Sequence, residues 1–133
     1  MTSEVTYLGD LRTSSKHLKS GDVFVTDAPT DNNGLGKAFS PTDSVATALA
    51  SCMFTIMGIK SKDLDIDLSN SKADVTKVMA SSPRRISEIH IHFNMNIELS
   101  SKDQTILENA AMTCPVIYSI HPDIKKEIRF NWG

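Results

Sequence analysis

The clearest pattern of apolar and polar positions lies between residues 89 and 99. Apolar and polar residues alternate there, as Ile89, Ile91, Phe93, Met95, Ile97 and Leu99 against His90, His92, Asn94, Asn96 and Glu98. An alternation of period two is typical of a β-strand with one buried face and one wet face. We therefore predict a long strand over residues 89–99.

A second pattern predicts a long helix that is apolar on nearly every side. Ser40 is a suitable N-cap, Pro41 stands at the first helical position, and Asp43 stands where a capping box has its carboxylate. From there to residue 58 or 60, apolar residues occupy most positions. A helix without a polar face must be buried all round. One sheet of so short a chain can hardly cover it, so we expect a partner subunit.

The remaining segments complete a mixed pattern of strands and helices. We predict short strands near 5–7, 16–18 and 23–25, a turn at 19–22, a loop at 29–37, a strand at 74–79, a helix from 100 or 101 to Cys114, a short helix at 115–120 and a strand at 124–132. This order of elements predicts an α+β fold, with residues 1–133 as a single domain.

Composition and charge narrow the class of protein. The 133 residues carry a net charge of −2, which gives no footprint for nucleic acid or an anionic membrane surface. The N-terminus lacks the pattern of a signal peptide, and the longest apolar stretch, 45–59, is shorter than the ~20 residues of a membrane span. We expect a cytoplasmic protein, in which two cysteines are more often free or redox-active than a structural disulfide.

Cys52 and Cys114 are the candidate reactive residues. Cys52 lies about 18 Å along its helix, too far for the helix dipole to lower its pKa, so a reactive Cys52 needs a basic side chain from elsewhere. The alternative is that it is a small buried hydrophobe. Cys114 precedes Pro115 and is placed like an N-cap, which by itself favours the more acidic thiol. The alternative is a buried cysteine at a helix break.

We expect no metal and no organic cofactor. Two cysteines 62 residues apart do not resemble a zinc site, and His90 and His92 share a strand face without an obvious third ligand. No catalytic serine triad, phosphate-binding loop or glycine-rich dinucleotide fingerprint is present. Arg12 lies in a turn-like stretch, where a lone arginine is usually solvated.

Two motifs together carry a resemblance to a known family. The segment from Ser40-Pro41-Thr42-Asp43 through Ala48-Leu49-Ala50-Ser51-Cys52-Met53, followed downstream by Cys114-Pro115-Val116, resembles the OsmC/Ohr family, the osmotically induced protein C and organic hydroperoxide resistance proteins. The resemblance implies an OsmC-like fold of antiparallel sheets wrapped around central helices. It also implies an interlocked homodimer with thiol peroxidase activity.

The resemblance also assigns roles to residues. Cys52 resembles the peroxidatic cysteine and Cys114 the resolving one. This assignment reverses the order of acidity that the helix dipole by itself favours for the two thiols. Arg12 is the best match to the family's thiolate-stabilising arginine. Many members hold that arginine with a glutamate ten residues before the first cysteine. Here Thr42 occupies that position, and the neighbouring Asp43 is the candidate substitute.

The resulting hypothesis is an enzyme that reduces organic hydroperoxides and is reset by a dithiol reductant. Apolar neighbours of the first cysteine, Met53, Phe54 and Met57, favour alkyl or lipid peroxides over hydrogen peroxide. The alternative is a non-catalytic or sensor-type member that binds a small apolar ligand.

Overall fold

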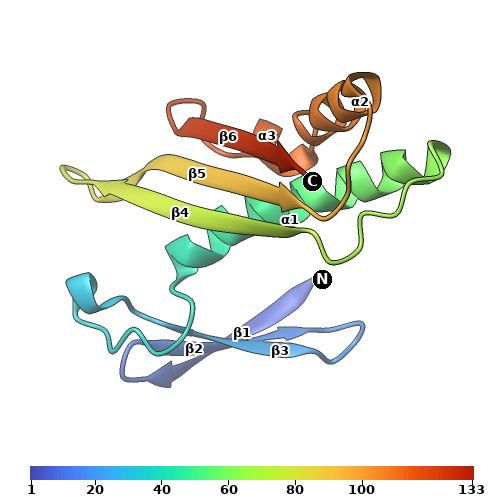
Figure 1. Ribbon diagram of the computed structural model, residues 1–133. Coiled ribbons are helices and arrows are strands. Elements are labelled where there is room, and N and C mark those ends of the chain that lie inside the picture. Colours follow the sequence, from blue (N-terminus) through green and yellow to red (C-terminus); the bar gives the residue numbers. More distant parts are fainter. The chain divides into compact units, whose positions relative to one another are not determined.

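Six strands form two separate three-stranded sheets, one in each of the two units into which the chain divides (Figure 1). The computed structural model describes residues 1–133. The first unit comprises residues 1–45 and the second comprises residues 46–133. Strands and helices are present in every region where the sequence predicts them, and the fold is α+β.

The first unit is an antiparallel sheet of β1 (Ser3–Gly9), β2 (Arg12–His17) and β3 (Val23–Asp27), followed by a loop with one 3-10 turn, Thr30–Asn32. The β1–β2 turn places Asp10 and Leu11 at φ values of 54° and 62°. Arg12, which the sequence places in a turn-like stretch, is the first residue of β2 and pairs with Asp27 of β3. The three predicted strands and the predicted loop are confirmed, except that β2 begins at Arg12 and ends at His17 instead of spanning 16–18.

This first unit buries no large apolar side chain. Its buried residues, Thr26, Asp27 and Ser40, are polar. Its exposed large apolar side chains include Val5, Tyr7, Leu8, Leu11, Leu18, Val23, Phe24, Leu35 and Phe39. An exposed apolar area of this kind is typical of a surface that another element or subunit covers.

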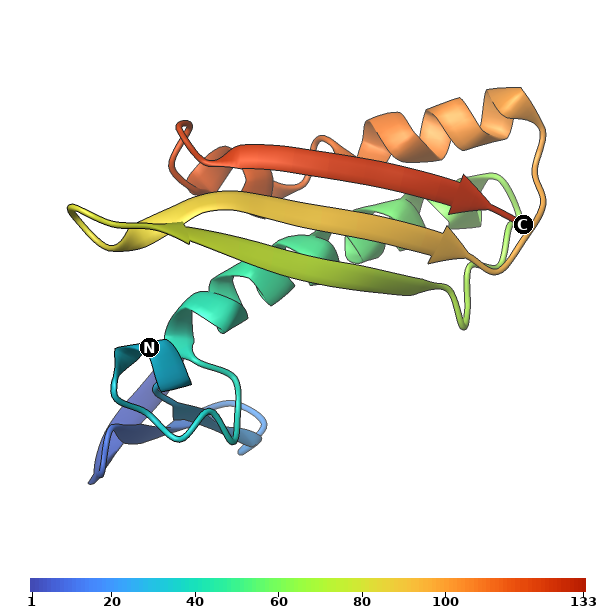
Figure 2. The ribbon, with the colours of Figure 1, turned by 60° about the vertical axis from the view of Figure 1, so that its left-hand side comes forward.

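The second unit holds a sheet in the order β4–β5–β6, with helices packed on one face (Figure 2). Its elements are α1 (Pro41–Asp63, which begins in the first unit), β4 (Lys72–Ala80), β5 (Arg85–Met95), α2 (Ser101–Ala111), α3 (Pro115–Ser119) and β6 (Lys125–Trp132). Strands β4 and β5 are antiparallel, whereas β5 and β6 are parallel. The expectation of antiparallel sheets is therefore wrong for this one pair. The reason is that α2 and α3 supply the long crossover that a parallel connection needs.

The core lies between this sheet and its helices. The inward-facing residues of β5 (Ile89, Ile91, Phe93 and Met95) are buried, as their alternation predicts. They pack with Leu49, Met53 and Met57 of α1 and with Leu107 and Ala111 of α2. The strand ends at Met95, however, so Ile97 and Leu99 do not extend it as predicted. The chain turns there toward the Ser100 cap of α2.

Helix α1 is longer than expected and is buried along only part of its surface. It ends at Asp63, and its buried residues are Ala46, Leu49, Ala50, Met53, Met57 and Ser61. Ile59 is 60% exposed. The single chain therefore does not bury this helix all round. By length and composition alone α1 can also cross a membrane, but core helices of soluble proteins pass the same test, so one such helix is weak support for a span.

Candidate functional site

The second unit brings Cys52 and Cys114 together, although they are 62 residues apart in the chain. Cys52 lies on α1, half-buried against the core, and Cys114 is fully buried between α2 and α3. Both are free thiols that are not at disulfide distance. Cys52 lies near enough to contribute to the raised pKa of the Cys114 thiol. Two free thiols therefore share one apolar environment.

Cys114 is the N-cap of α3, as the sequence predicts. Its backbone is extended, with φ −68° and ψ 146°, because the proline that follows disfavours the helical region for the residue before it. Pro115 then occupies the first turn of the helix. The Ile117 backbone N–H donates to Cys114 Sγ at 3.4 Å. The sulfur is thus held in one orientation by local backbone geometry.

Burial, not the cap, sets the acidity of Cys114. The pKa of the Cys114 thiol lies above its ordinary value of 9.0, first because burial disfavours the thiolate, and further because the Cys52 side chain acts on it. The N–H groups of Ile117 and Val116 oppose this rise in pKa without overcoming it. The helix-end argument, which by itself favoured Cys114 as the more acidic of the two thiols, therefore fails for this buried sulfur. Helix α3 has only five residues, so its end offers little stabilisation to a thiolate, and the Cys114 side chain is not exposed to water.

Asp43 forms the capping box that its position predicts. Its Oδ2 accepts from the Ser40 N–H at 3.0 Å, and its own N–H donates to Ser40 Oγ at 3.1 Å. These reciprocal bonds satisfy two backbone donors at the start of α1. The carboxylate of Asp43 is thus engaged in holding the helix end.

Arg12 and its strand neighbour Asp27 both carry a buried atom without a partner. Arg12 Nε has no hydrogen bond. Asp27 is fully buried, with Oδ2 accepting from the Lys37 N–H at 3.1 Å and Oδ1 left without a partner. An unsatisfied buried polar group costs about 1–3 kcal/mol. Arg12 lies in the first unit and the cysteines in the second, so its role toward Cys52 stays a prediction.

The apolar neighbours of Cys52 in sequence are mostly core residues. Met53 and Met57 are fully buried, and Phe54 packs edge-on against Phe93 at 4.8 Å between ring centroids. These two methionine side chains are therefore not exposed on the surface of the single chain. The exposed apolar side chains of the helices in the second unit are instead Ile59, Met112 and Tyr118.

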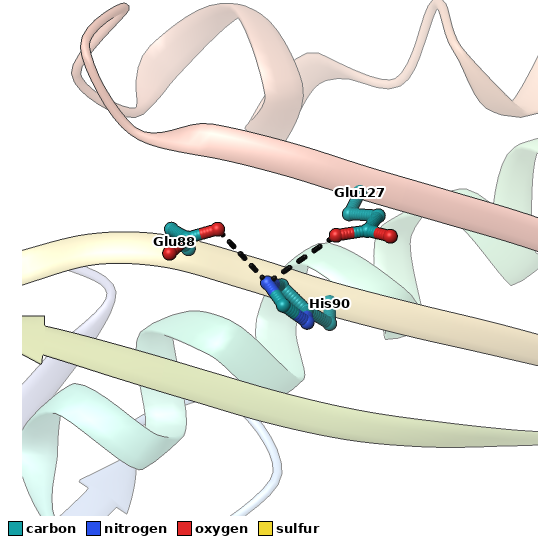
Figure 3. A group of neighbouring side chains, drawn as sticks. All are labelled: Glu88, His90 and Glu127. Atoms are coloured by element: carbon teal, nitrogen blue, oxygen red, sulfur yellow. Dashed lines mark hydrogen bonds and ion pairs between the residues drawn. The ribbon is translucent and has the colours of Figure 1, made fainter.

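A separate cluster of polar side chains lies on the outer face of β5 and β6 (Figure 3). It consists of Glu88, His90 and Glu127, all half-buried. His90 Nε2 lies 3.1 Å from Glu88 Oε1 and 3.6 Å from Glu127 Oε2. Sequence reasoning grouped His90 with His92 and missed both glutamates. The spacing of Glu88 and His90 on one strand face was the available signal. Glu127 comes close to His90 only because β6 pairs with β5.

A family model for OsmC-like proteins matches residues 34–129. No curated protein sequence shows significant similarity to the chain. Among solved structures, one from Psychrobacter arcticus 273-4 is 57% identical, with a TM-score of 0.96 over 98% of this chain and 96% of the other. It is provisionally named an osmotic stress induced and detoxification response protein.

More distant structures share the fold. An OsmC-like protein from Mycoplasma pneumoniae has a TM-score of 0.80 at 14% identity, over 98% of this chain and 94% of its own. An organic hydroperoxide resistance protein from Legionella pneumophila has a TM-score of 0.76 at 13% identity, over 98% of this chain and 97% of its own. At these identities the likeness extends to the architecture alone.

Proposed function

Since the chain belongs to the OsmC-like protein family, we propose that it is a thiol peroxidase that reduces organic hydroperoxides through Cys52 and Cys114. The observation that supports this most directly is the interaction of the two free thiols within one apolar core.

In the first step the Cys52 thiolate attacks the terminal, hydrogen-bearing oxygen of the peroxide. The O–O bond breaks, the alkyl-bearing oxygen takes a proton from water and leaves as an alcohol, and Cys52 becomes a sulfenic acid. Sulfur is oxidised by two electrons and the O–O bond is reduced by the same two. Cys52 suits this step better than Cys114, because Cys114 is fully buried and its raised pKa keeps it protonated.

In the second step Cys114 attacks the sulfenic sulfur. The S–O bond breaks, the Cys114 proton leaves with the hydroxyl as water, and a Cys52–Cys114 disulfide forms. A movement that brings the two sulfurs together is needed, since they are not at disulfide distance. A dithiol reductant then restores both thiols by disulfide exchange.

Arg12 is proposed to stabilise the Cys52 thiolate and the charge that develops on the departing oxygen. The buried Nε of Arg12 without a partner supports a guanidinium that is not committed elsewhere. Asp43 is proposed to act through the start of α1, because its carboxylate is held in the capping box.

We propose that the active protein is a homodimer and is cytoplasmic. The exposed apolar residues of the first unit and the uncovered surface of α1 support a dimer, since both need cover from water. A reducing compartment suits a redox pair that must return to free thiols. Organic peroxides are the proposed substrates, because the solved structures named for organic hydroperoxide resistance share this fold.

Intact-mass analysis tests the proposal. The reduced protein is treated with one equivalent of cumene hydroperoxide, and we expect a loss of two hydrogens that a small dithiol reverses. Cys52→Ser is expected to leave Cys114 unmodified. Steady-state consumption of tert-butyl and cumene hydroperoxide with a dithiol is expected to exceed that of hydrogen peroxide.

The result that overturns the proposal is the persistence of two free thiols after this treatment. A small apolar ligand bound by a protein with inert cysteines then becomes the better account. Thermal shift with and without an apolar alcohol, such as cumyl alcohol, distinguishes that outcome from an unfolded sample.

A further inference from the structure

We propose that Glu88, His90 and Glu127 form a binding site for a divalent transition-metal ion, of which Zn²⁺ is the best match. The site lies on the outer face of the β4–β5–β6 sheet, opposite the face that packs on the helices (Figure 3). It is independent of the cysteines and of the proposed peroxidase function.

The spacing of the ligand atoms suits a metal ion. Zn–N and Zn–O bonds of about 2.0–2.2 Å in a tetrahedral site separate neighbouring ligand atoms by roughly 3.3–3.5 Å. His90 Nε2 is 3.1 Å from Glu88 Oε1 and 3.6 Å from Glu127 Oε2, and ligand atoms of all three residues lie within 4.8 Å of one another. Small rotations of the carboxylates complete one face of a tetrahedron and leave the fourth position to water.

The backbone fixes where these side chains stand. His90 is directly paired with Glu127 across the parallel β5–β6 ladder. Glu88 lies two residues before His90, so both side chains leave the same face of β5. Ligands on paired strands vary less in position than ligands on a loop, which lowers the entropic cost of binding.

A neighbouring arginine orients one of the ligands. Arg129 Nη2 donates to Glu127 Oε1 at 2.8 Å, and the other oxygen, Oε2, faces His90. An outer group that holds a ligand in this way is typical of metal sites in proteins. Lys125 Nζ is 3.8 Å from Glu88 Oε1, a looser contact that leaves this carboxylate room to turn toward a metal.

The donor set selects the class of metal. An imidazole nitrogen with two carboxylate oxygens suits Zn²⁺, Co²⁺ or Ni²⁺ better than Ca²⁺ or Mg²⁺, which prefer oxygen ligands alone. Metal and proton compete for His90, because only the neutral imidazole is a ligand.

Calorimetric titration of the untagged protein with Zn²⁺ tests the site. Cys52→Ser/Cys114→Ser serves as the background, because free thiols bind zinc by themselves. In that background we expect one Zn²⁺ per chain. His90→Ala and Glu127→Gln are each expected to weaken binding by tenfold or more, whereas the matched control His92→Ala, two residues along the same face, is expected to leave binding unchanged.

A second measurement uses the protein with both cysteines intact, in case the double variant does not fold. Co²⁺ is added and the imidazole NMR signals of the four histidines are followed. The signal of His90 is expected to shift or broaden first, ahead of those of His17, His92 and His121. Equal binding by His90→Ala, no binding in the thiol-free background, or equal broadening of all four signals overturns the proposal. The cluster is then an ion-pair network and nothing more.

Discussion

At the scale of single residues, Cys114 shows two opposing effects on one sulfur. The N–H groups at the start of α3 favour a thiolate, and burial disfavours it. Desolvation acts on the whole charge, whereas a hydrogen bond of 3.4 Å to sulfur is weak. Burial therefore prevails, and the pKa of Cys114 is raised.

This raised pKa predicts that the reduced protein loses stability at high pH. A thiol whose pKa is higher in the folded state binds its proton more tightly there. Its contribution to the free energy of unfolding is complete below the ordinary cysteine pKa and is lost as pH rises through the folded value. Urea unfolding at pH 8 and pH 10, with a reductant, is expected to show a larger loss for the wild type than for Cys114→Ser. Equal losses contradict the prediction.

Replacement of Arg12 tests the proposed activation of Cys52. Arg12→Ala is expected to slow alkylation of Cys52 and to slow peroxide reduction by about a hundredfold, the usual effect of removing one group that stabilises developing charge. The pH dependence of Cys52 alkylation, measured in Cys114→Ser, reports the change. Arg84→Ala, an exposed arginine between β4 and β5, is the control. If Arg12→Ala does not change the pH dependence of Cys52 alkylation, Arg12 does not stabilise the Cys52 thiolate.

Cys114→Ser is expected to stop the reaction at the Cys52 sulfenic acid. No second thiol is then available to attack the sulfenic sulfur and form a disulfide, so excess peroxide oxidises Cys52 further to the sulfinic acid. Mass spectrometry detects these as additions of one and two oxygens. Trapping by a carbonyl nucleophile confirms the first. A Cys114→Ser protein that turns over as fast as the wild type excludes Cys114 as the resolving thiol.

At the scale of elements, the start of α1 depends on a pair of reciprocal bonds. Ser40 and Asp43 satisfy each other's backbone N–H groups. Asp43→Ala is expected to lower the free energy of unfolding by about 0.5–2 kcal/mol, the usual cost of losing a cap. Asp43→Asn retains an acceptor oxygen and is expected to lose less. Denaturant unfolding at pH 7 measures both.

The same variants separate capping from catalysis. If Asp43 acts only through the helix end, Asp43→Asn keeps most of the peroxidase rate. A large loss of rate with little loss of stability instead assigns the carboxylate to the reaction, as a partner of Arg12.

At the scale of the whole molecule, the apolar surface exceeds what one chain covers. Val5 and Phe24 are both paired with Ser15 and share one face of the first sheet, where each is more than half exposed. We expect sedimentation to give twice the mass of one chain. Val5→Asp with Phe24→Asp is expected to weaken the dimer, whereas Thr6→Asp on the opposite face is not. A stable monomer of the wild type at micromolar concentration contradicts this prediction.

The sequence by itself determined what depends on neighbours along the chain. The alternation in β5, the capping box at Ser40 and Asp43, and the N-cap geometry of Cys114 before Pro115 each follow from a few adjacent residues. The paired motifs around Cys52 and Cys114 also identified the family. Local sterics and hydrogen bonds act within about four residues, so such features are readable without the fold.

Only the tertiary structure decided what depends on segments far apart. Four features join residues from separate elements: the packing of Cys52 and Cys114 in one core, the raised pKa of Cys114, the parallel pairing of β6 with β5, and the approach of Glu127 to His90. Burial and long-range pairing are set by how the sheet and helices pack as a whole. For that reason an argument from the charge at the helix end alone gave the wrong direction for the pKa of Cys114. The strand pattern alone did not place the two glutamates beside His90.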